Sequence, residues 1–288
     1  MKLKTELFYI LRLLNPRYTP VCRFNLRHYY SYFKNRFFGL KLLKKLSPYY
    51  NNEITDDLEI HILCSKMDLY MCAWALRSFL YYSELNPKII IYNDGSIEKK
   101  YADLLESKFN NLTVLKIPDI IGEPDIIDKY IKKGHPLMKK LIGPFYTAKA
   151  DNVIVMDSDV LFFKKPQEII DFIDQDKVKS LVSGGLKNGE KEISSGFMIL
   201  KKEVLNINIL VEYLINQPKK MDDYFVEQNG WDYIIRQTKF EFLPLNTYKI
   251  KYPPDSNTIM KHFTTPRRHE LYAWGIEKLK KDMNYVPL

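Results

Sequence analysis

The alternation of short apolar runs with longer stretches of helical spacing, from residue 58 to residue 156, is the feature that most constrains the fold. Glu59–Cys64, Lys88–Tyr92 and Asn152–Met156 are apolar at almost every position. A strand that buries one face alternates polar and apolar side chains, whereas continuous apolar strands separated by helices are typical of a parallel sheet covered on both faces. The sequence therefore predicts an α/β fold with a mostly parallel central sheet, whose ligands bind beyond the carboxyl ends of the strands.

The remaining elements follow from hydrophobic periodicity and turn signals. We expect a helix to begin near Asp68, whose side chain can cap it, and Asn188-Gly189 predicts the turn of a β-hairpin. The other expected elements are helices at Ile97–Phe109, Leu137–Lys149, Glu203–Asn216 and Glu227–Gln237, strands at Leu112–Ile117, Ser180–Leu186 and Ile193–Leu200, and a final segment at Met260–Thr265.

Positive charge is concentrated near the N-terminus. The chain of 288 residues has a formal net charge of +9, yet residues 1–50 contain eleven Lys and Arg against one acidic residue, Glu6. The rest of the chain is therefore close to neutral. We divide the sequence into a basic, aromatic-rich helical extension, residues 1–50, and a larger domain, residues 58–288.

The basic extension is compatible with three roles. Cations attract anionic lipid headgroups and aromatic rings sit at the membrane boundary, which favours attachment to a membrane surface. The same composition suits nucleic acid, which we rank as the less favoured partner. In the third role the rings pack on the larger domain and the charges remain in water.

Cysteine usage and hydropathy indicate the compartment. The three cysteines, Cys22, Cys64 and Cys72, have neither paired nor metal-ligand spacing, which argues against a disulfide framework. The sequence has no run of eighteen or more apolar residues. We expect a cytoplasmic protein, with peripheral attachment to the cytoplasmic face of a membrane as an option.

Two acidic residues follow the apolar run Asn152–Met156. Asp157 and Asp159 stand on either side of Ser158, at the end of a buried strand, where their mutual repulsion calls for a cation. Carboxylate oxygens suit Mg²⁺ or Mn²⁺, which bridge protein groups to substrate phosphates. The spacing alone is weak evidence, because Asp174-Gln175-Asp176 repeats it at the polar end of a predicted helix. The position is what favours a metal site.

The strand, the Asp-Ser-Asp triplet and the apolar residues after it resemble the metal-binding motif of glycosyltransferases with the GT-A fold, a Rossmann-like fold. The resemblance spans most of residues 58–275 and is nearest to the retaining, family-8-like group. Its other elements are Ile60–Cys64 with Ser65, Asn93-Asp94-Gly95-Ser96, Ser194-Ser195-Gly196-Phe197-Met198, Glu227-Gln228, and His262 near the C-terminus.

This resemblance implies a metal-dependent transfer of a sugar from a nucleotide-diphosphate sugar, which we expect to be UDP-linked, to a carbohydrate, lipid-linked or other acceptor. It assigns Asp157, Asp159 and His262 to a divalent metal, Mn²⁺ or Mg²⁺. Ser65 and Asp94 would contact the nucleotide.

Further roles apply to the donor sugar and the reacting centre. Ser195 and Gly196 would line the donor sugar pocket, and Lys261 would stabilise the departing diphosphate. Glu227 with Gln228 would act beside the reacting carbon, and if the reaction inverts the anomeric centre, Glu227 or Asp232 would deprotonate the acceptor. The stereochemical outcome stays open at this point.

Two other functions remain as alternatives. A sugar-phosphate nucleotidyltransferase would share the sheet and the carboxylates, but its glycine-rich phosphate loop is missing after the first strand, which reads Cys64-Ser65-Lys66-Met67-Asp68. A non-enzymatic protein that binds membranes or nucleic acid through residues 1–50 would leave the ordered motifs of residues 58–275 unexplained.

Overall fold

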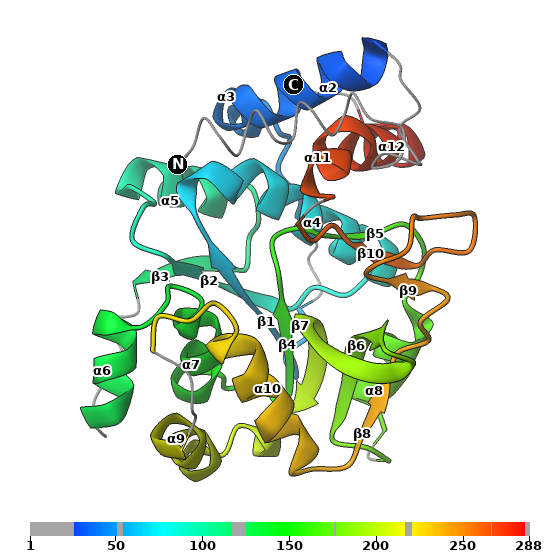
Figure 1. Ribbon diagram of the computed structural model, residues 1–288. Coiled ribbons are helices and arrows are strands. Elements are labelled where there is room, and N and C mark those ends of the chain that lie inside the picture. The colour runs from blue at the N-terminus through cyan, green and yellow to red at the C-terminus, as the bar shows by residue number, and fades with distance from the viewer. Residues whose placement is uncertain are drawn as a thin grey trace.

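The computed structural model describes residues 26–50, 54–116, 125–175, 177–216, 221–265 and 267–285. Its centre is a seven-stranded sheet in the order β3-β2-β1-β4-β7-β6-β8 (Figure 1). The strands are β1 (Leu58–Cys64), β2 (Lys88–Asn93), β3 (Leu112–Lys116), β4 (Asn152–Met156), β5 (Val160–Phe162), β6 (Ser180–Lys187), β7 (Glu190–Lys201), β8 (Phe240–Phe242), β9 (Tyr248–Lys249) and β10 (Met260–His262). The helices are α2 (Leu26–Phe37), α3 (Gly39–Lys44), α4 (Leu69–Ser83), α5 (Lys99–Glu106), α6 (Asp125–Lys133), α7 (Met138–Thr147), α8 (Gln167–Ile173), α9 (Ile207–Asn216), α10 (Val226–Arg236), α11 (Arg268–Glu270) and α12 (Ile276–Asp282), and a π-helical turn, Leu271–Gly275, joins the last two.

The prediction of a mostly parallel sheet is confirmed. Strands β3, β2, β1 and β4 pair in parallel, so the carboxyl ends of these strands lie along one edge. Strand β7 then pairs antiparallel with β4, because it returns through the β6–β7 hairpin. At the turn of that hairpin Asn188 and Gly189 both have positive φ, 52° and 86°, which is the conformation that the Asn-Gly pair predicts.

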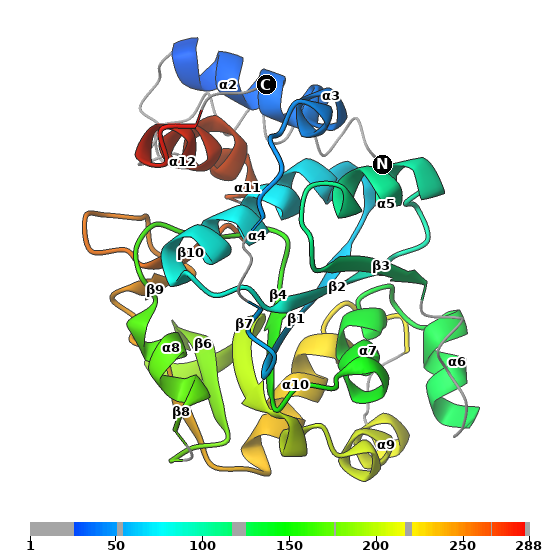
Figure 2. The same ribbon diagram turned by 180° about the vertical axis from the view of Figure 1, so that it is seen from behind.

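Helices cover both faces of the sheet, as the continuous apolar strands predict. Along β4, Ile154 and Met156 pack in the core that includes α4 and α5, whereas Val153 and Val155 pack in the core that includes α7, α9 and α10. Figures 1 and 2 show these two helical layers above and below the sheet. Each side chain of β4 is therefore buried against one layer or the other, and the strand has no face for water.

A second, three-stranded sheet has the order β5-β10-β9. Strand β5 begins directly after the Asp157–Asp159 triplet, and β10 runs antiparallel to it with His262 opposite Val160. This pairing places His262, from the C-terminal part of the chain, at the carboxyl edge of the main sheet.

Several predicted element boundaries are wrong in an informative way. Asp68 does not cap α4, because its carboxylate accepts a hydrogen bond from the Ser65 hydroxyl, at 2.9 Å, within the short turn before the helix. Helix α9 begins at Ile207 rather than Glu203, since Asn206 Oδ1 accepts the N–H of Asn208 at 2.9 Å and starts the helix there. The predicted end of the third strand, Ile117, lies outside the described residues.

The basic extension is described from residue 26 onward. Helix α2 packs one face on the C-terminal helices, where Tyr32 is buried and the Asn35 side-chain amide donates to the Tyr272 carbonyl at 2.8 Å. The first 25 residues of the segment lie outside the described ranges. Among the described helices, none is long and apolar enough to cross a bilayer.

Candidate active site

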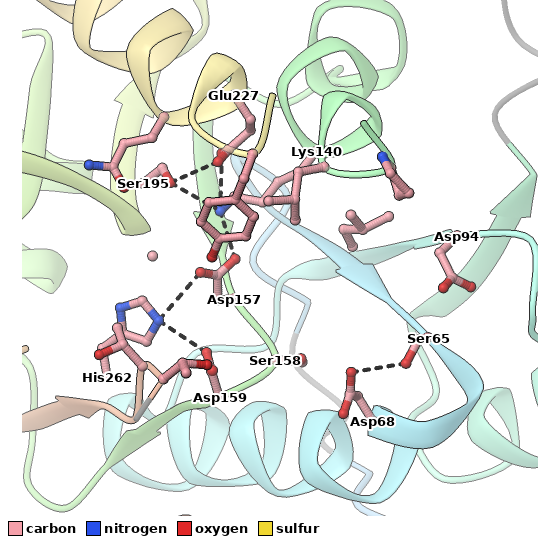
Figure 3. Close-up of a pocket in the computed structure, with 18 of the residues that line it drawn as sticks. Ser65, Asp68, Asp94, Lys140, Asp157, Ser158, Asp159, Ser195, Glu227 and His262 are labelled. Carbon is pink, nitrogen blue, oxygen red and sulfur yellow. Dashed lines mark hydrogen bonds and ion pairs between the residues drawn. The ribbon is translucent and has the colours of Figure 1, made fainter. Parts of the chain in front are cut away.

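A cleft of about 370 Å³ opens at the carboxyl edge of β1, β2 and β4 (Figure 3). Parallel strands deliver the residues that follow them to the same edge, so motifs that are far apart in the sequence meet here. The predicted site residues that line this cleft are Ser65, Asp94, Asp157, Asp159, Ser195, Gly196, Glu227, Gln228 and His262. The structure therefore brings together most of the set that the sequence singled out.

Asp157 and Asp159 share a tight turn between β4 and β5. The Asp157 N–H donates to the Gly196 carbonyl at 2.8 Å, and the Asp159 carbonyl accepts the N–H of Phe263 at 2.9 Å, so the turn is fixed from both sides. The carboxylates converge on one atom, His262 Nε2, which lies 3.4 Å from Asp157 Oδ2 and 3.0 Å from Asp159 Oδ1. One possible ligand atom from each of the three residues lies within 4.8 Å of the other two.

These three residues fit a divalent ion. Asp159 Oδ1 is buried and makes no hydrogen bond of good geometry, with His262 Nε2 3.0 Å away. A buried carboxylate oxygen without a hydrogen bond is costly unless a cation is near. Two carboxylate oxygens and an imidazole are a donor set that Mn²⁺ accepts well and that Mg²⁺ accepts through its oxygens.

The position of the His262 ring depends on Gly196. A Cβ atom added at residue 196 would lie 2.1 Å from two atoms of the ring, far inside van der Waals contact. Only a glycine at position 196 therefore leaves room for the imidazole to lie against β7.

Three cations balance the buried carboxylates, and sequence reasoning missed the most buried of them. The Lys140 ammonium, on α7, lies 2.6 Å from Asp157 Oδ1 and 3.1 Å from Glu227 Oε1, and its side chain is only 2% exposed. The helix carries Lys139 beside Lys140, and neither the spacing nor the composition distinguishes the two. The apolar neighbours Met138, Leu141 and Ile142 indicate that part of this helix is buried, but they do not show which of the two lysines is buried with it.

The second and third cations act on Asp159. Arg268 Nη2 lies 2.7 Å from Asp159 Oδ2, and Arg268 Nε donates to the same oxygen at 2.9 Å. Burial lowers the pKa of the His262 imidazole, but the charges of Asp159 and Asp157 outweigh it and raise that pKa to about 9. In the metal-free protein His262 is therefore a cation near neutral pH.

The same charges hold the two aspartates ionised. Burial raises the pKa of the Asp157 carboxyl, but Lys140 and His262 together lower that pKa by more than burial raises it, so the net change is downward. Burial likewise raises the pKa of Asp159, and Arg268 with His262 reverses the effect. Both carboxylates are therefore available as ligands throughout the physiological range.

Glu227 behaves differently from the aspartates. Burial raises the pKa of its carboxyl, and the attraction of Lys140 only partly offsets that rise. Its Oε2 accepts the Ser195 hydroxyl at 3.0 Å, whereas Oε1 lies 3.1 Å from the Lys140 ammonium and makes no hydrogen bond of good geometry. Gln228, the next residue, also lines the cleft.

Two predicted site residues lie elsewhere, which corrects the expectation for them. Lys261 is fully buried, and its ammonium donates to the Ile250 carbonyl on the side of β10 opposite His262, because successive residues of a strand point to opposite faces. Asp232 pairs with Arg236 at 2.8 Å on the exposed face of α10. It lies five positions after Glu227 along the helix, which turns it away from the cleft.

The nucleotide-contacting candidates stand at the other end of the cleft. Asn93 ends β2, and its side-chain oxygen accepts the N–H groups of Gly95 and Ile97 at 2.8 and 3.0 Å, which shapes the loop. Within that loop Asp94 Oδ1 accepts the Ser96 hydroxyl at 2.6 Å, and the Asp94 side chain lines the cleft. Ser65 lines it from the end of β1.

Several solved structures with the same architecture are glycosyltransferases. The chain superposes on the galactosyltransferase LgtC, solved with donor and acceptor sugar analogues, at a TM-score of 0.51 and 14% identity, covering 80% of this chain and 97% of LgtC. For the bifunctional glycosyltransferase WbbM the TM-score is 0.54 and the identity 12%, over 81% of this chain and 53% of WbbM. For the glycosyltransferase GlyE of Streptococcus pneumoniae the values are 0.53 and 12%, over 78% of this chain and 63% of GlyE.

The fold is the GT-A fold. The resemblance inferred from the sequence is thus confirmed at the level of architecture, and the match to LgtC is consistent with a family-8-like arrangement. The chain spans about half the length of WbbM and somewhat less than two thirds of GlyE. No family model matches the sequence, and no curated protein matches it either.

Replacing Gly196 with Ala should displace the His262 ring and weaken Mn²⁺ binding by about tenfold or more, as loss of one ligand contact does in metal sites. Isothermal titration calorimetry of the purified protein with Mn²⁺ measures this. Gly185→Ala is the matched control, since a Cβ there would meet only the flexible Lys251 side chain at 3.4 Å. Unchanged Mn²⁺ affinity in Gly196→Ala would show that the ring is not a ligand.

Replacing Lys140 with Met should lower the free energy of unfolding by about 3 kcal/mol, because it leaves Glu227 buried without its cation. Adding Glu227→Gln to that variant should recover part of the loss, since the charge of Glu227 is then absent while Asp157 still has His262 beside it. Urea unfolding at pH 7 of the two single variants and the double variant gives the coupling. Strictly additive effects would mean that the two side chains do not interact.

Proposed function

We propose that this protein is a metal-dependent glycosyltransferase that takes a sugar from a nucleotide-diphosphate sugar. The observation that carries the proposal is the convergence of Asp157, Asp159 and His262 at the carboxyl edge of a GT-A sheet. Oxygen-rich clusters in this position suit a cation that also binds substrate phosphates. We infer a UDP-linked donor from the motif resemblance, and a carbohydrate or lipid-linked acceptor.

The metal would be held by Asp157, Asp159 and His262. When bound, Mn²⁺ or Mg²⁺ would supply Lewis-acid stabilisation of the charge that develops on the departing diphosphate. Arg268 replaces Lys261 as the protein cation assigned to that charge, because its guanidinium lines the cleft beside Asp159. A diphosphate would draw Arg268 partly away from Asp159 while keeping it charge-paired.

Glu227, Ser195 and Lys140 form one wall of the cleft and would surround the donor sugar. Because Glu227 Oε2 accepts the Ser195 hydroxyl and Oε1 faces the Lys140 ammonium, we assign this carboxylate to binding and to stabilising positive charge at the reacting carbon, together with Gln228. A base that deprotonates an acceptor needs a free oxygen within hydrogen-bond reach of it. Glu227 Oε1, which has an ion pair but no hydrogen bond, could also take that role, so both stereochemical courses stay open.

The nucleotide would lie between the ends of β1 and β2. Ser65 and Asp94 face this end of the cleft, and we assign them to the ribose and the base. The turn that follows β1, Lys66–Asp68, contains no glycine, so the described loop lacks the backbone cradle that a nucleotidyltransferase needs for a triphosphate. Sugar transfer is therefore the better supported of the two enzymatic readings.

Asp159→Asn should reduce Mn²⁺-dependent release of nucleoside diphosphate from a UDP-sugar by at least about a hundredfold, because the metal supplies several kcal/mol of charge stabilisation. A screen of UDP-sugars with coupled detection of UDP measures the rate. Asp174→Asn, which alters the exposed carboxylate of the other Asp-x-Asp triplet, is the control and should turn over like the unaltered protein. Full turnover in Asp159→Asn would remove the basis for the assignment.

A further inference from the structure

The docked helix α2 has an outer face that the rest of the described structure leaves uncovered. Its inner face is fixed by Tyr32, which is 1% exposed, and by Asn35, which bonds to the Tyr272 carbonyl. Residues three and four apart return to the same side of a helix, so the outer positions form a single stripe that continues into α3. We call these positions the α2–α3 outer face, and they are Arg27, Tyr30, Phe33, Lys34, Phe37, Phe38, Lys41, Lys44 and Lys45.

Large apolar side chains gather on this face. Tyr30 is 67% exposed, Phe37 is 52% exposed and Phe38 is 51% exposed. Isolated exposed rings are ordinary on a protein surface, but a cluster of them on one element marks an interaction site. Figure 1 shows α2 and α3 at the outer edge of the molecule, with α2 above α11 and α12 and α3 above α4 and α5.

The charge of the same face is entirely positive. The face carries five Lys and Arg, and residues 26–46 contain no Asp or Glu. On helix surfaces that only face water, acidic and basic residues usually alternate and form pairs, as Lys132 with Asp128 does on α6. A helix with aromatic rings and basic residues, but no acidic residue of its own on that side, is suited to an interface between water and anionic headgroups.

We propose that the α2–α3 outer face docks on the surface of a lipid bilayer that carries anionic headgroups. The lysines would contact the headgroups, and the rings would enter the boundary with the acyl chains. Phe33 and Phe37 already stack on each other with ring centroids 5.6 Å apart, and Lys41 lies over the ring of Phe38 at 5.5 Å. Ring faces that are covered in this way are poor platforms for nucleic acid bases, whereas ring edges suffice for entry into a membrane.

This surface is connected to the cleft by a short path. Arg36, on the side of α2 that faces the domain, lies 3.7 Å from the Asp68 carboxylate, and Asp68 lines the cleft. Docking of α2 would therefore hold one rim of the cleft at a fixed orientation to the bilayer. The proposal does not depend on the transferase reaction and is tested without it.

Sedimentation of the full chain with vesicles tests the proposal. Vesicles of phosphatidylglycerol and phosphatidylcholine should retain the protein, and vesicles of phosphatidylcholine alone should retain at least about tenfold less. The charge variant Lys41→Glu, Lys44→Glu, Lys45→Glu should lose at least about tenfold in binding, as should the ring variant Phe33→Ser, Phe37→Ser, Phe38→Ser. Higher salt should weaken the binding of the unaltered protein.

Two controls isolate the face. Lys164→Glu, Lys165→Glu, Lys177→Glu changes the net charge equally at exposed positions of another surface, and Tyr252→Ser removes another exposed ring. Both should bind vesicles like the unaltered protein. Circular dichroism and thermal unfolding confirm that each variant is folded.

Three results would overturn the proposal. They are no retention of the unaltered protein by the anionic vesicles, retention of the charge and ring variants equal to it, and loss of retention that the control variants share. Binding of a single-stranded oligonucleotide that the charge and ring variants abolish, with vesicle retention unchanged, would assign the face to nucleic acid instead.

Discussion

The site depends on keeping two neighbouring carboxylates, the buried Asp159 and the partly exposed Asp157, ionised at the end of a strand. Asp157 and Asp159 repel each other, and neither would remain charged away from water without opposite charge nearby. The protein supplies that charge from three distant elements, through Lys140 on α7, His262 on β10 and Arg268 at the start of α11. The carboxylates are thus what ties the C-terminal part of the chain to the central sheet. A divalent ion placed among them would leave an excess of positive charge, which a diphosphate would offset, so we expect metal and donor to support each other's binding.

The two sheets divide the work of building this arrangement. The parallel strands of the larger sheet end together and deliver Ser65, Asp94 and the Asp157–Asp159 turn to one edge. The smaller sheet exists because β5 continues from that turn and β10 pairs with it, which returns His262 to the carboxylates. Gly196 on β7 leaves the space that the imidazole occupies. Sheet topology therefore determines which residues meet. The absence of a side chain at Gly196 determines how closely the His262 ring approaches β7.

Much of this could be predicted from the sequence because it is local. Apolar runs such as Asn152–Met156 reveal buried strands, and Asn188-Gly189 reveals a turn, since each depends only on neighbouring residues. The candidate residues that follow strands, such as Asp94 and Asp157, were found for the same reason. Lys140 was missed, and Lys261 and Asp232 were assigned to the site, because the position of each depends on which way its side chain points in the assembled protein. A lysine reads as a surface residue in any helix, and adjacent residues of β10 cannot be distinguished until the strand is placed against its partner.

The location of the metal is the central claim, and anomalous X-ray diffraction from crystals grown with Mn²⁺ and a nucleoside diphosphate tests it most directly. The account predicts a manganese peak within coordination distance, about 2.0–2.3 Å, of an oxygen of Asp157 and of Asp159 and of a nitrogen of His262, with the diphosphate on its open side. A peak at another position, or a diphosphate bound in the cleft with no metal beside these three residues, would contradict it.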